Sequence, residues 1–407
     1  MRFSFLFLPS LLGFISGLPL CLVGSTLQAW GASVNLNLMV LGWLTLIGAP
    51  YSYKFLWAPV LDKFPPVFWK DHRRGWILNL MLLLMIGIFF LSYTQPQQKL
   101  FPFIFCSFTV ATIAATLDIA IDAFRTEFLP KTAYGTGNAS FIAAYRISGL
   151  ISGASTLILA NYWGWRFAYQ MMIVLMLFSF FVFLLTSKTS ATSESRLKKS
   201  DALSEPVFKP FKALFQIPKI GWILLFIILY KLGEALASAL MTPFLIKELH
   251  FSLTALASIY KTIALTASIS GAFLGGLLYN RYSLYSCLMS FGILQGSGIL
   301  LFAILAHVGH SYPWAITAIA GEAFTAGMAT TVFLAFLMNL CNPNYTATHF
   351  ALFSAFAAIG RIFTGPLASL LVQTYHWQIF FILCFFSCWP GLILLTRLKK
   401  NFLINFT

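Results

Sequence analysis

The chain has 407 residues, of which 59% are hydrophobic and only 9% are charged, and its formal net charge is +15. Soluble domains usually carry about 25% charged residues, so this composition argues against an ordinary soluble protein. The apolar runs are continuous rather than alternating, which argues against a transmembrane barrel.

Twelve apolar stretches in the sequence are long enough to cross a membrane as helices, which takes about 20 residues each. Their predicted limits are 6–28, 38–59, 76–94, 101–124, 136–160, 166–187, 221–246, 254–279, 285–306, 313–340, 347–373 and 377–397. The sequence therefore predicts an all-α membrane protein with twelve transmembrane helices.

The basic residues gather in loops on one predicted side of the membrane. These loops contain Lys63, Lys70, Arg73, Arg74, Arg125, Lys131, Lys188, Arg196, Lys198, Lys199, Lys209, Lys212, Lys219, Arg281, Arg397, Lys399 and Lys400. The opposite loops contain little more than Lys99, Arg166 and Lys247. The positive-inside rule predicts that both termini are cytoplasmic, and it accounts for the net charge without a nucleic-acid partner.

The second predicted span contains a basic residue, Lys54, with Tyr51 close to it. Lys54 either snorkels to the interface, which is the simpler interpretation, or belongs to a polar site that binds cargo. A tyrosine ring beside an intramembrane charge suits sugar binding, although packing with a satisfied hydroxyl is the ordinary role of a single tyrosine.

The loop after this span contains an acidic-basic pair, Asp62 and Lys63, followed by Arg73 and Arg74. The pattern resembles the loop signature of the major facilitator superfamily and predicts a gating loop. Positive-inside topology alone would also explain the two arginines.

The fourth predicted span contains Asp118 and Asp122, although the whole chain has only 11 acidic residues. Residues four apart share one face of a helix. Two carboxylates close together in a low-dielectric site favour the binding of a proton, which suits a proton carrier. Asp122 could instead anchor the end of the span by pairing with Arg125 or with a base on another helix. We favour pairing for Asp122 and proton coupling for Asp118.

The fifth predicted span places Arg146 near the membrane midplane, next to Tyr145. A charge at that depth costs at least about 2.5–3.5 kcal/mol, so it needs a function. A guanidinium binds a carboxylate bidentately, which makes Arg146 a candidate for binding an anionic cargo.

The segment 188–220 is rich in Ser, Lys and Glu, and it predicts a flexible cytoplasmic linker. It separates an N-terminal bundle of six spans, 1–187, from a C-terminal bundle of six, 221–407.

The C-terminal bundle contains Lys231 and Glu234, three residues apart, with Tyr230 beside them, and Glu322 in the tenth span. Lys231 and Glu234 form either a structural ion pair or part of a transport site. Glu234 and Glu322 are further candidates for proton coupling.

Two basic residues of this bundle, Lys261 and Arg361, have no acid at short helical spacing. Each must therefore find a partner on another helix, a water-filled cavity or an anionic substrate. Tyr260 precedes Lys261 and is a candidate for the wall of such a site.

The sequence shows no motif typical of soluble catalysis. There is no GxxxxGK[ST] loop for ATP, and the six cysteines and the histidines lack metal-ligand spacing. Trp30, Trp163, Trp165 and Trp377 lie at span ends and are typical of an interfacial belt. We expect no catalytic residues, no metal and no cofactor beyond a proton gradient.

The two predicted bundles repeat each other weakly. WAPVLDKF (57–64) corresponds to LLYNRY (277–282), and AYRISG (144–149) corresponds to IGRIFTG (359–365). Parallel repeats of this kind are typical of the major facilitator architecture, in which substrate binds between the two halves near the midplane.

Longer segments resemble one family within this architecture. They are LGFISGLPLCLVGSTLQAW (12–30), YKFLWAPVLDKF (53–64), HRRGW (72–76), LDIAIDAFRTEFLP (117–130), YRISGLISGA (145–154), LYKLGEALASALMTPFLI (229–246), KTIALTASISGAFLGGLLYNRYSLYSCLMSFGILQG (261–296), FLAFLMNLCNPNYTATHFALFSAFAAIGRIFTGPLA (333–368) and PGLILL (390–395). In this order they resemble AmpG, the muropeptide permease family of Gram-negative bacteria, over nearly the whole chain except the linker and tail.

The resemblance implies a monomeric, proton-driven permease of the bacterial inner membrane. Its cargo would be N-acetylglucosaminyl-1,6-anhydro-N-acetylmuramyl peptides, imported for peptidoglycan recycling and, in some bacteria, for the signal that induces beta-lactamase. Some members carry further spans, whereas we count twelve here. Arg146 and Arg361 are then the first candidates for binding cargo, with Lys231 and Lys261 next.

Other classes of function fit the sequence less well. The acetyl-CoA transporters have a similar shape and also carry a large anion, but the long segments above favour the muropeptide family. A membrane-embedded enzyme would need a clustered His/Asp or Ser/His site at one membrane face, which we do not find. A sensor with the linker as its output is disfavoured by the low complexity of that segment.

Overall fold

The computed structural model describes residues 2–34, 36, 40, 44–66, 68–69, 71–186, 209–217, 219–251 and 253–401. These residues are nearly all helical, and none of them forms a strand. Nine helices in this part of the chain are long and apolar enough to cross a membrane. The predicted all-α membrane fold is confirmed.

Two long helical stretches each contain two predicted spans. The stretch Lys131–Leu185 has 55 residues, which at 1.5 Å per residue would be about 80 Å long, against about 30 Å for a bilayer core. Gly164, with φ of 82°, interrupts it between the fifth and sixth predicted spans. His376, with φ of 60°, interrupts α16 between the eleventh and twelfth.

The second predicted span is a chain of short turns rather than one helix. Its described elements are η1 (Thr45–Gly48), α4 (Ala49–Tyr53), η2 (Lys54–Leu56) and α5 (Ala58–Lys63). Pro50 and Pro59 lie in the first turns of α4 and α5. Proline is tolerated there but cannot donate to a preceding turn, so the helix restarts at each proline.

The chain divides into two compact units, which are described separately. Unit 1 comprises 1–130, 144–214 and 341–355, and unit 2 comprises 131–143, 215–340 and 356–407. The units differ from the predicted bundles in two segments. The start of the fifth predicted span belongs to unit 2, and the start of the eleventh predicted span belongs to unit 1. These two segments occupy equivalent places in the repeat.

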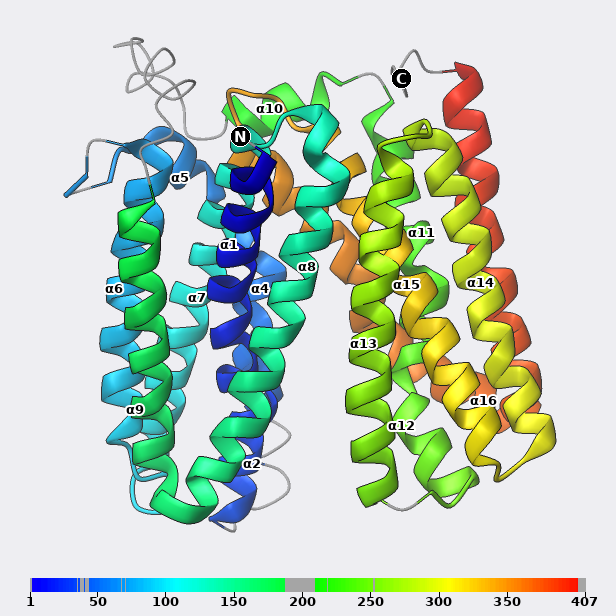
Figure 1. The fold of residues 1–407 in the computed structure, drawn as a ribbon, viewed down its shortest axis with the longest axis horizontal. Helices are drawn as coiled ribbons and strands as arrows, with labels where there is room; N and C mark the ends of the chain where they lie inside the picture. The colour runs from blue at the N-terminus through cyan, green and yellow to red at the C-terminus, as the bar shows by residue number, and fades with distance from the viewer. Residues whose placement is uncertain are drawn as a thin grey trace. The chain divides into compact units, whose positions relative to one another are not determined.

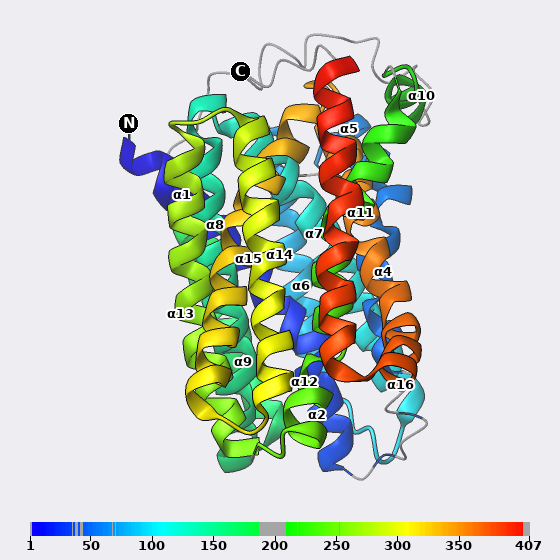
Figure 2. The ribbon, with the colours of Figure 1, turned by 90° about the vertical axis from the view of Figure 1, so that its right-hand side faces the viewer.

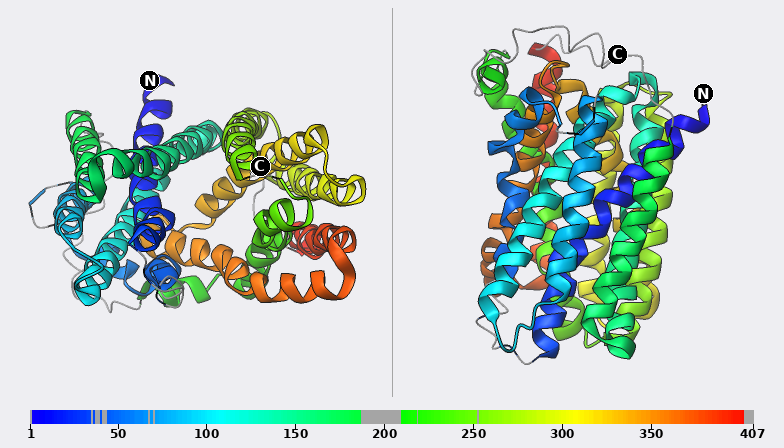
Figure 3. Two further views of the ribbon diagram at one scale, coloured as in Figure 1. Left: turned by 90° about the horizontal axis from the view of Figure 1, so that it is seen from below. Right: turned by 90° about the vertical axis from the view of Figure 1, so that its left-hand side faces the viewer.

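Unit 1 is built around α7, which packs against α1 and α6, while α6 also packs against α9 (Figure 1; Figure 3, right). Its elements, besides those of the second span, are α1 (Arg2–Val23), α2 (Ser25–Ser33), α6 (His72–Ser92), α7 (Leu100–Phe128), the end of α8 (Tyr134–Leu150) from residue 144 on, the π-helical turn η4 (Ile151–Ser155), α9 (Thr156–Leu185) and α10 (Lys209–Phe215). The start of α1, α5 and α10 lie at one end of the unit, and the end of α2 lies at the other (Figure 1).

The helix α10 corrects one expectation about the linker. Residues 188–220 were predicted to be flexible throughout, and residues 188–208 lie outside the described part of the chain. Lys209–Phe215 is a helix whose Pro210 and Leu214 are buried. Apolar side chains at 210 and 214, one helical turn apart, give this short helix a face that packs on the rest of unit 1.

Unit 2 is built around α15, which packs against both α13 and α14 (Figure 2). Its elements are η3 (Lys131–Ala133), α8 up to residue 143, α11 (Ile220–Ala239), α12 (Met241–Pro243), the π-helical turn η6 (Phe244–Glu248), α13 (Leu253–Tyr279), α14 (Leu284–Val308), α15 (Tyr312–Leu340) and most of α16 (Thr346–Asn401). Gly271 and Gly275 let α13 touch the α15 backbone, since a Cβ at Gly271 would lie 2.0 Å from the Phe324 carbonyl oxygen. Small residues four apart are a usual means of close helix packing in membranes.

Candidate functional site

A first cluster of buried charges in unit 1 surrounds Lys54. Its Nζ lies 4.0 Å from Asp118 Oδ2 and 3.7 Å from Asp122 Oδ2. Lys54 is 6% exposed, so the interpretation that it snorkels to the interface is wrong. The 3-10 turn η2, which sequence reasoning did not foresee, holds this lysine inside the bundle.

A second base completes the cluster. Arg125 Nη2 donates to Asp122 Oδ1 at 2.9 Å, and Arg125 is only 1% exposed. Asp122 therefore pairs with Arg125 as favoured from the sequence, and also with Lys54. Two carboxylates face two bases, so the four side chains carry no net formal charge together. This pairing offsets part of the cost of burying charges in a low-dielectric interior.

The deeper acid, Asp118, is also held from α1. Ser16 Oγ donates to Asp118 Oδ1 at 2.5 Å. The next residue, Gly17, allows α8 to approach at this level, since a Cβ there would lie 2.5 Å from the Tyr145 carbonyl oxygen. Asp118 therefore lies where α1, α7 and the η2 turn meet, with α8 against α1.

The other polar candidates of unit 1 lie on α4 and α8. The buried Oη of Tyr51 has no hydrogen-bond partner among the described residues. Tyr145 and Arg146 are half-buried on α8. A buried hydroxyl without a protein partner is unusual in native structures and marks a place where a ligand or a proton could be received.

A second polar cluster lies inside unit 2. Lys231 Nζ donates to Glu234 Oε2 at 2.7 Å and to Thr330 Oγ1 at 2.9 Å. Gln295 Nε2 donates to the same Glu234 oxygen at 2.7 Å. Three helices, α11, α14 and α15, therefore meet at one carboxylate.

Tyr230 has an ordinary packing role in this cluster. Its ring stacks on Phe333, with 5.3 Å between ring centroids, and its Oη donates to the Leu288 carbonyl at 3.1 Å. Glu322 is half-buried on α15. Lys261, Tyr260 and Arg361 lie on helices whose backbone is described there, but their side chains lie outside the described part.

A third polar cluster lies at the end of unit 1 that carries α5. Arg73 Nη2 lies 2.6 Å from Asp62 Oδ1 and 2.9 Å from Glu127 Oε1, and Arg73 Nη1 donates to the Leu61 carbonyl at 2.9 Å. Arg73 is 6% exposed. Topology alone does not explain a buried arginine that bridges two acids.

The same cluster holds the N-terminus of α16. Asp62 accepts from the backbone N–H of Ala347 at 3.2 Å and of Thr348 at 2.8 Å, while Thr346 donates to Glu127. A helix N-terminus carries about half a positive charge, which helps to balance two acids against one arginine. We call Asp62, Arg73, Glu127, Thr346 and Thr348 the latch.

The remaining residues of the predicted gating loop lie apart from the latch. Arg74 Nη2 donates to the carbonyls of Phe183 at 3.2 Å and Leu184 at 2.6 Å, which end α9. A base at the last carbonyls of a helix is a usual C-terminal cap. Lys63 Nζ lies 5.6 Å from the centroid of the Phe64 ring.

The short helix α10 is tied to the same end of α16 through His349. His349 Nδ1 accepts from the Asn342 N–H at 3.2 Å, so Nε2 carries the proton and donates to the Pro210 carbonyl at 3.1 Å. His349 is 1% exposed. The start of α16 is thus held by the latch and by the end of the predicted linker.

Sequence reasoning missed the partners that complete these clusters. They are Ser16, Glu127, Gln295, Thr330, Thr346 and Thr348. The fourth span was predicted to end at 124, whereas α7 continues to Phe128 and so includes Glu127. Gln295 and the hydroxyl residues carry no charge, so nothing in the sequence alone marks them within an apolar span. No group of three metal-ligating side chains occurs within the described residues.

Comparison with known proteins agrees with this architecture. The sequence profile of the Major Facilitator Superfamily matches residues 4–362 and 232–401. The chain is 37% identical to the anhydromuropeptide permease of Escherichia coli K12 over 404 residues, which cover 97% of this chain and 81% of the permease. It is 33% identical to an uncharacterised protein of Haemophilus influenzae, over 94% of this chain and 92% of that protein.

Solved structures share the fold at low identity. The proton:xylose symporter XylE superposes with a TM-score of 0.74 at 11% identity, covering 98% of this chain and 95% of that structure. The E. coli fucose:proton symporter FucP superposes with a TM-score of 0.71 at 15% identity, covering 96% and 98%. The chain belongs to the Major Facilitator Superfamily of membrane transporters, within the group that includes the E. coli anhydromuropeptide permease.

Proposed function

We propose that this transporter imports N-acetylglucosaminyl-1,6-anhydro-N-acetylmuramyl peptides from the periplasm to the cytoplasm, together with protons, by alternating access. The observation that carries the proposal is the 37% identity with the E. coli anhydromuropeptide permease over 97% of this chain. The protein would act as a monomer in the bacterial inner membrane, surrounded by lipid, with no cofactor besides the proton gradient. Where the host uses these peptides as a signal, import would also support beta-lactamase induction.

The buried bases suit a cargo with peptide carboxylates. Arg146 and Arg361 are the first candidates to bind them, because guanidinium groups pair with carboxylates bidentately. Lys231 and Lys261 are second candidates. Lys231 donates to Glu234 at 2.7 Å, so it would have to exchange this partner for the cargo. Tyr51, whose buried hydroxyl has no partner among the described residues, would contribute a further polar contact.

The cluster around Lys54 supports proton coupling by charge balance. With Asp118 and Asp122 ionised, the two acids offset Lys54 and Arg125, which lie within 4.0 Å of them. A proton on Asp118 would leave one uncompensated positive charge in a buried place, and an anionic cargo nearby would relieve it. Proton and anion would then favour each other's binding, as symport requires. Glu234 and Glu322 are the corresponding candidates in unit 2.

The latch lies at the proposed cytoplasmic end, where the positive-inside rule puts the loop that contains Asp62, Lys63, Arg73 and Arg74. We propose that it closes this end in one state of the transport cycle and opens in the other.

The test is uptake of labelled anhydromuropeptide into liposomes that contain the purified protein, with and without an acidic exterior. We expect uptake that rises with the gradient, and a loss of that rise in Asp118→Asn while exchange of cargo between the two sides continues. Full gradient-driven uptake by Asp118→Asn would remove Asp118 from the coupling. Uptake of acetyl-CoA but not of anhydromuropeptide would contradict the proposed cargo.

A further inference from the structure

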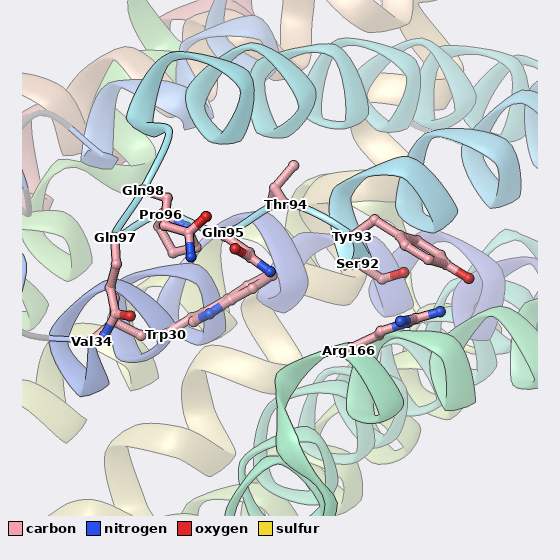
Figure 4. Close-up of a pocket in the computed structure, with 10 residues that line it drawn as sticks. All are labelled: Trp30, Val34, Ser92, Tyr93, Thr94, Gln95, Pro96, Gln97, Gln98 and Arg166. Carbon is pink, nitrogen blue, oxygen red and sulfur yellow. The ribbon is translucent and has the colours of Figure 1, made fainter.

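A pocket lies at the end of unit 1 opposite the latch, between the end of α2, the loop joining α6 to α7, and α9 just after Gly164 (Figure 4). Its volume is about 420 Å³, within the usual range of about 300–1,000 Å³ for small-molecule sites. The lining residues are Trp30, Val34, Ser92, Tyr93, Thr94, Gln95, Pro96, Gln97, Gln98 and Arg166.

Among the described residues that line the pocket, Arg166 alone is charged. Its guanidinium carbon lies 3.8 Å from the centroid of the Tyr93 ring, and Figure 4 shows the two groups facing each other at one end of the pocket. Among the described residues, none forms an ion pair or hydrogen bond with Arg166. A guanidinium that rests flat on a ring keeps its N–H groups at the edge available for an anion.

The rest of the pocket offers neutral polar groups on a rigid base. Gln95, Gln97 and Gln98 project amides that both donate and accept hydrogen bonds. Trp30 forms the base: it is 4% exposed, and its ring stacks on Trp165 with 5.6 Å between centroids. The expectation that Trp30 belongs to an interfacial belt is therefore wrong.

The two aromatic rings of the described lining differ, because Trp30 is buried whereas Tyr93 is 48% exposed. Trp30 is buried, Arg166 covers one face of Tyr93, and Phe89 packs beside Tyr93 with 4.9 Å between centroids. The charged and amide groups of the lining, rather than its rings, therefore decide the ligand class, and they suit a peptide with a carboxylate.

We infer that this pocket binds the acidic peptide part of the cargo before it enters the transport path, with Arg166 holding a carboxylate and the three glutamines holding peptide groups. The inference rests on the proposed function and deepens it, because it assigns a second, external contact to the same cargo. It would give the transporter a preference for peptide-bearing over peptide-free sugar at low cargo concentration.

The test compares Arg166→Gln with Lys99→Gln, which removes an equal charge from the same loop region but does not line the pocket. The whole protein in lipid nanodiscs is titrated with N-acetyl-Ala-Glu and with its bis-amide. We expect Arg166→Gln to weaken binding of the dicarboxylate about tenfold or more, as loss of one charge-assisted hydrogen bond implies. Lys99→Gln should change the affinity for the dicarboxylate less than about twofold. The wild type should bind the bis-amide only as weakly as Arg166→Gln binds the dicarboxylate.

Uptake kinetics in liposomes provide the second readout. Arg166→Gln should raise KM for anhydromuropeptide and leave kcat unchanged, and it should not alter uptake of the peptide-free disaccharide. Equal binding by the two variants, or an unchanged KM, would overturn the pocket inference while uptake itself continued. If the wild type took up no anhydromuropeptide yet bound the dicarboxylate through Arg166, the proposed cargo would be wrong and the acidic-peptide site would stand.

Discussion

The Asp62 carboxylate and the backbone amide of Thr348 are separated by 286 positions in the sequence and joined by a hydrogen bond of 2.8 Å. The same carboxylate pairs with Arg73 at 2.6 Å. It is therefore balanced on one side by a guanidinium and on the other by a helix N-terminus. Removing one partner from a buried pair costs about 3–5 kcal/mol, so loss of Asp62 should weaken the latch.

Asp62→Asn should release the start of α16, and Cys341 provides a native reporter of the release. Cys341 is partly buried and lies between α15 and α16, outside the membrane-spanning segments. Burial, and after it the carboxylates of Asp62, Asp122 and Glu127, raise the pKa of its thiol. The thiolate is the reactive form, so maleimide should label Cys341 slowly at pH 7 in the wild type.

In Asp62→Asn the Cys341 thiol becomes more exposed to solvent and loses a neighbouring negative charge, so its pKa should fall toward the usual value. Maleimide labelling of Cys341 at pH 7 should then be at least about fivefold faster than in the wild type. Mass spectrometry of the peptide that contains Cys341 measures this directly. Asp71→Asn is the matched control, since Asp71 is an acid of the same loop that only caps α6 through the Arg74 N–H at 3.3 Å. Equal labelling in both variants would contradict a latch centred on Asp62.

His349→Ala should free α10 from the end of α16. It removes the donor to the Pro210 carbonyl and leaves that carbonyl in a buried place. The loss of such a hydrogen bond costs about 1–3 kcal/mol, which corresponds to roughly a five- to 150-fold rise in local opening. Trypsin should then cleave after Lys212 in α10 correspondingly faster, as followed by mass spectrometry.

Two variants control the His349 experiment. His349→Gln keeps a side-chain donor and should restore much of the protection. His310→Ala removes a comparable histidine contact, from Nδ1 to the Leu249 carbonyl at 2.6 Å, which lies in unit 2. Cleavage in α10 that rose equally in the His310 variant would mean a general loss of stability rather than release of α10.

The sequence predicted the spans well because their signal is local. A transmembrane helix can be recognised from the length of its own apolar run, without reference to any distant residue. The interruptions at Gly164 and His376 fall between predicted spans. The place of Lys54 could not be predicted in this way, since its burial depends on a 3-10 turn created by the positions of two prolines. A span drawn as one regular helix gives the wrong depth and direction for that side chain.

The partners of the site residues needed information that a single sequence does not carry. Arg73 was found from its charge, but nothing local to it indicates that Thr346, 273 positions away, accepts from its guanidinium. Gln295 escaped notice because an amide inside an apolar helix carries no charge. Its role depends on Glu234, 61 positions away, on another helix. The polar residues within spans are therefore predictable as a class, while their pairing is not.

Lys54→Met should prevent stable folding, because it leaves Asp118 and Asp122 buried with Arg125 as the remaining base of the cluster. The expected cost is about 3–5 kcal/mol in the free energy of unfolding. The amount of detergent-extracted protein that elutes in the peak of folded protein on size-exclusion chromatography should therefore fall sharply. Adding Asp118→Asn removes one acid with the base and should restore most of the folded protein. The restored double variant should transport without dependence on the proton gradient. A well-folded Lys54→Met protein with normal coupling would show that the cluster has no role in charge balance.

Gly271→Ala should destabilise unit 2 through a single methyl group. A Cβ at Gly271 would lie 2.0 Å from the Phe324 carbonyl oxygen, and backbone cannot yield as a flexible side chain can. Moving α13 away from α15 should cost about 1–3 kcal/mol, more than alanine gains over glycine in helix propensity, which is about 1 kcal/mol.

Gly221→Ala is the matched control, since a Cβ there meets nothing within 4 Å. Thermal unfolding of the purified variants, followed by intrinsic fluorescence, should show a lower Tm for Gly271→Ala and an equal or slightly higher Tm for Gly221→Ala. Equal Tm values would contradict the prediction, because they would mean that the contact between α13 and α15 accommodates the added methyl group.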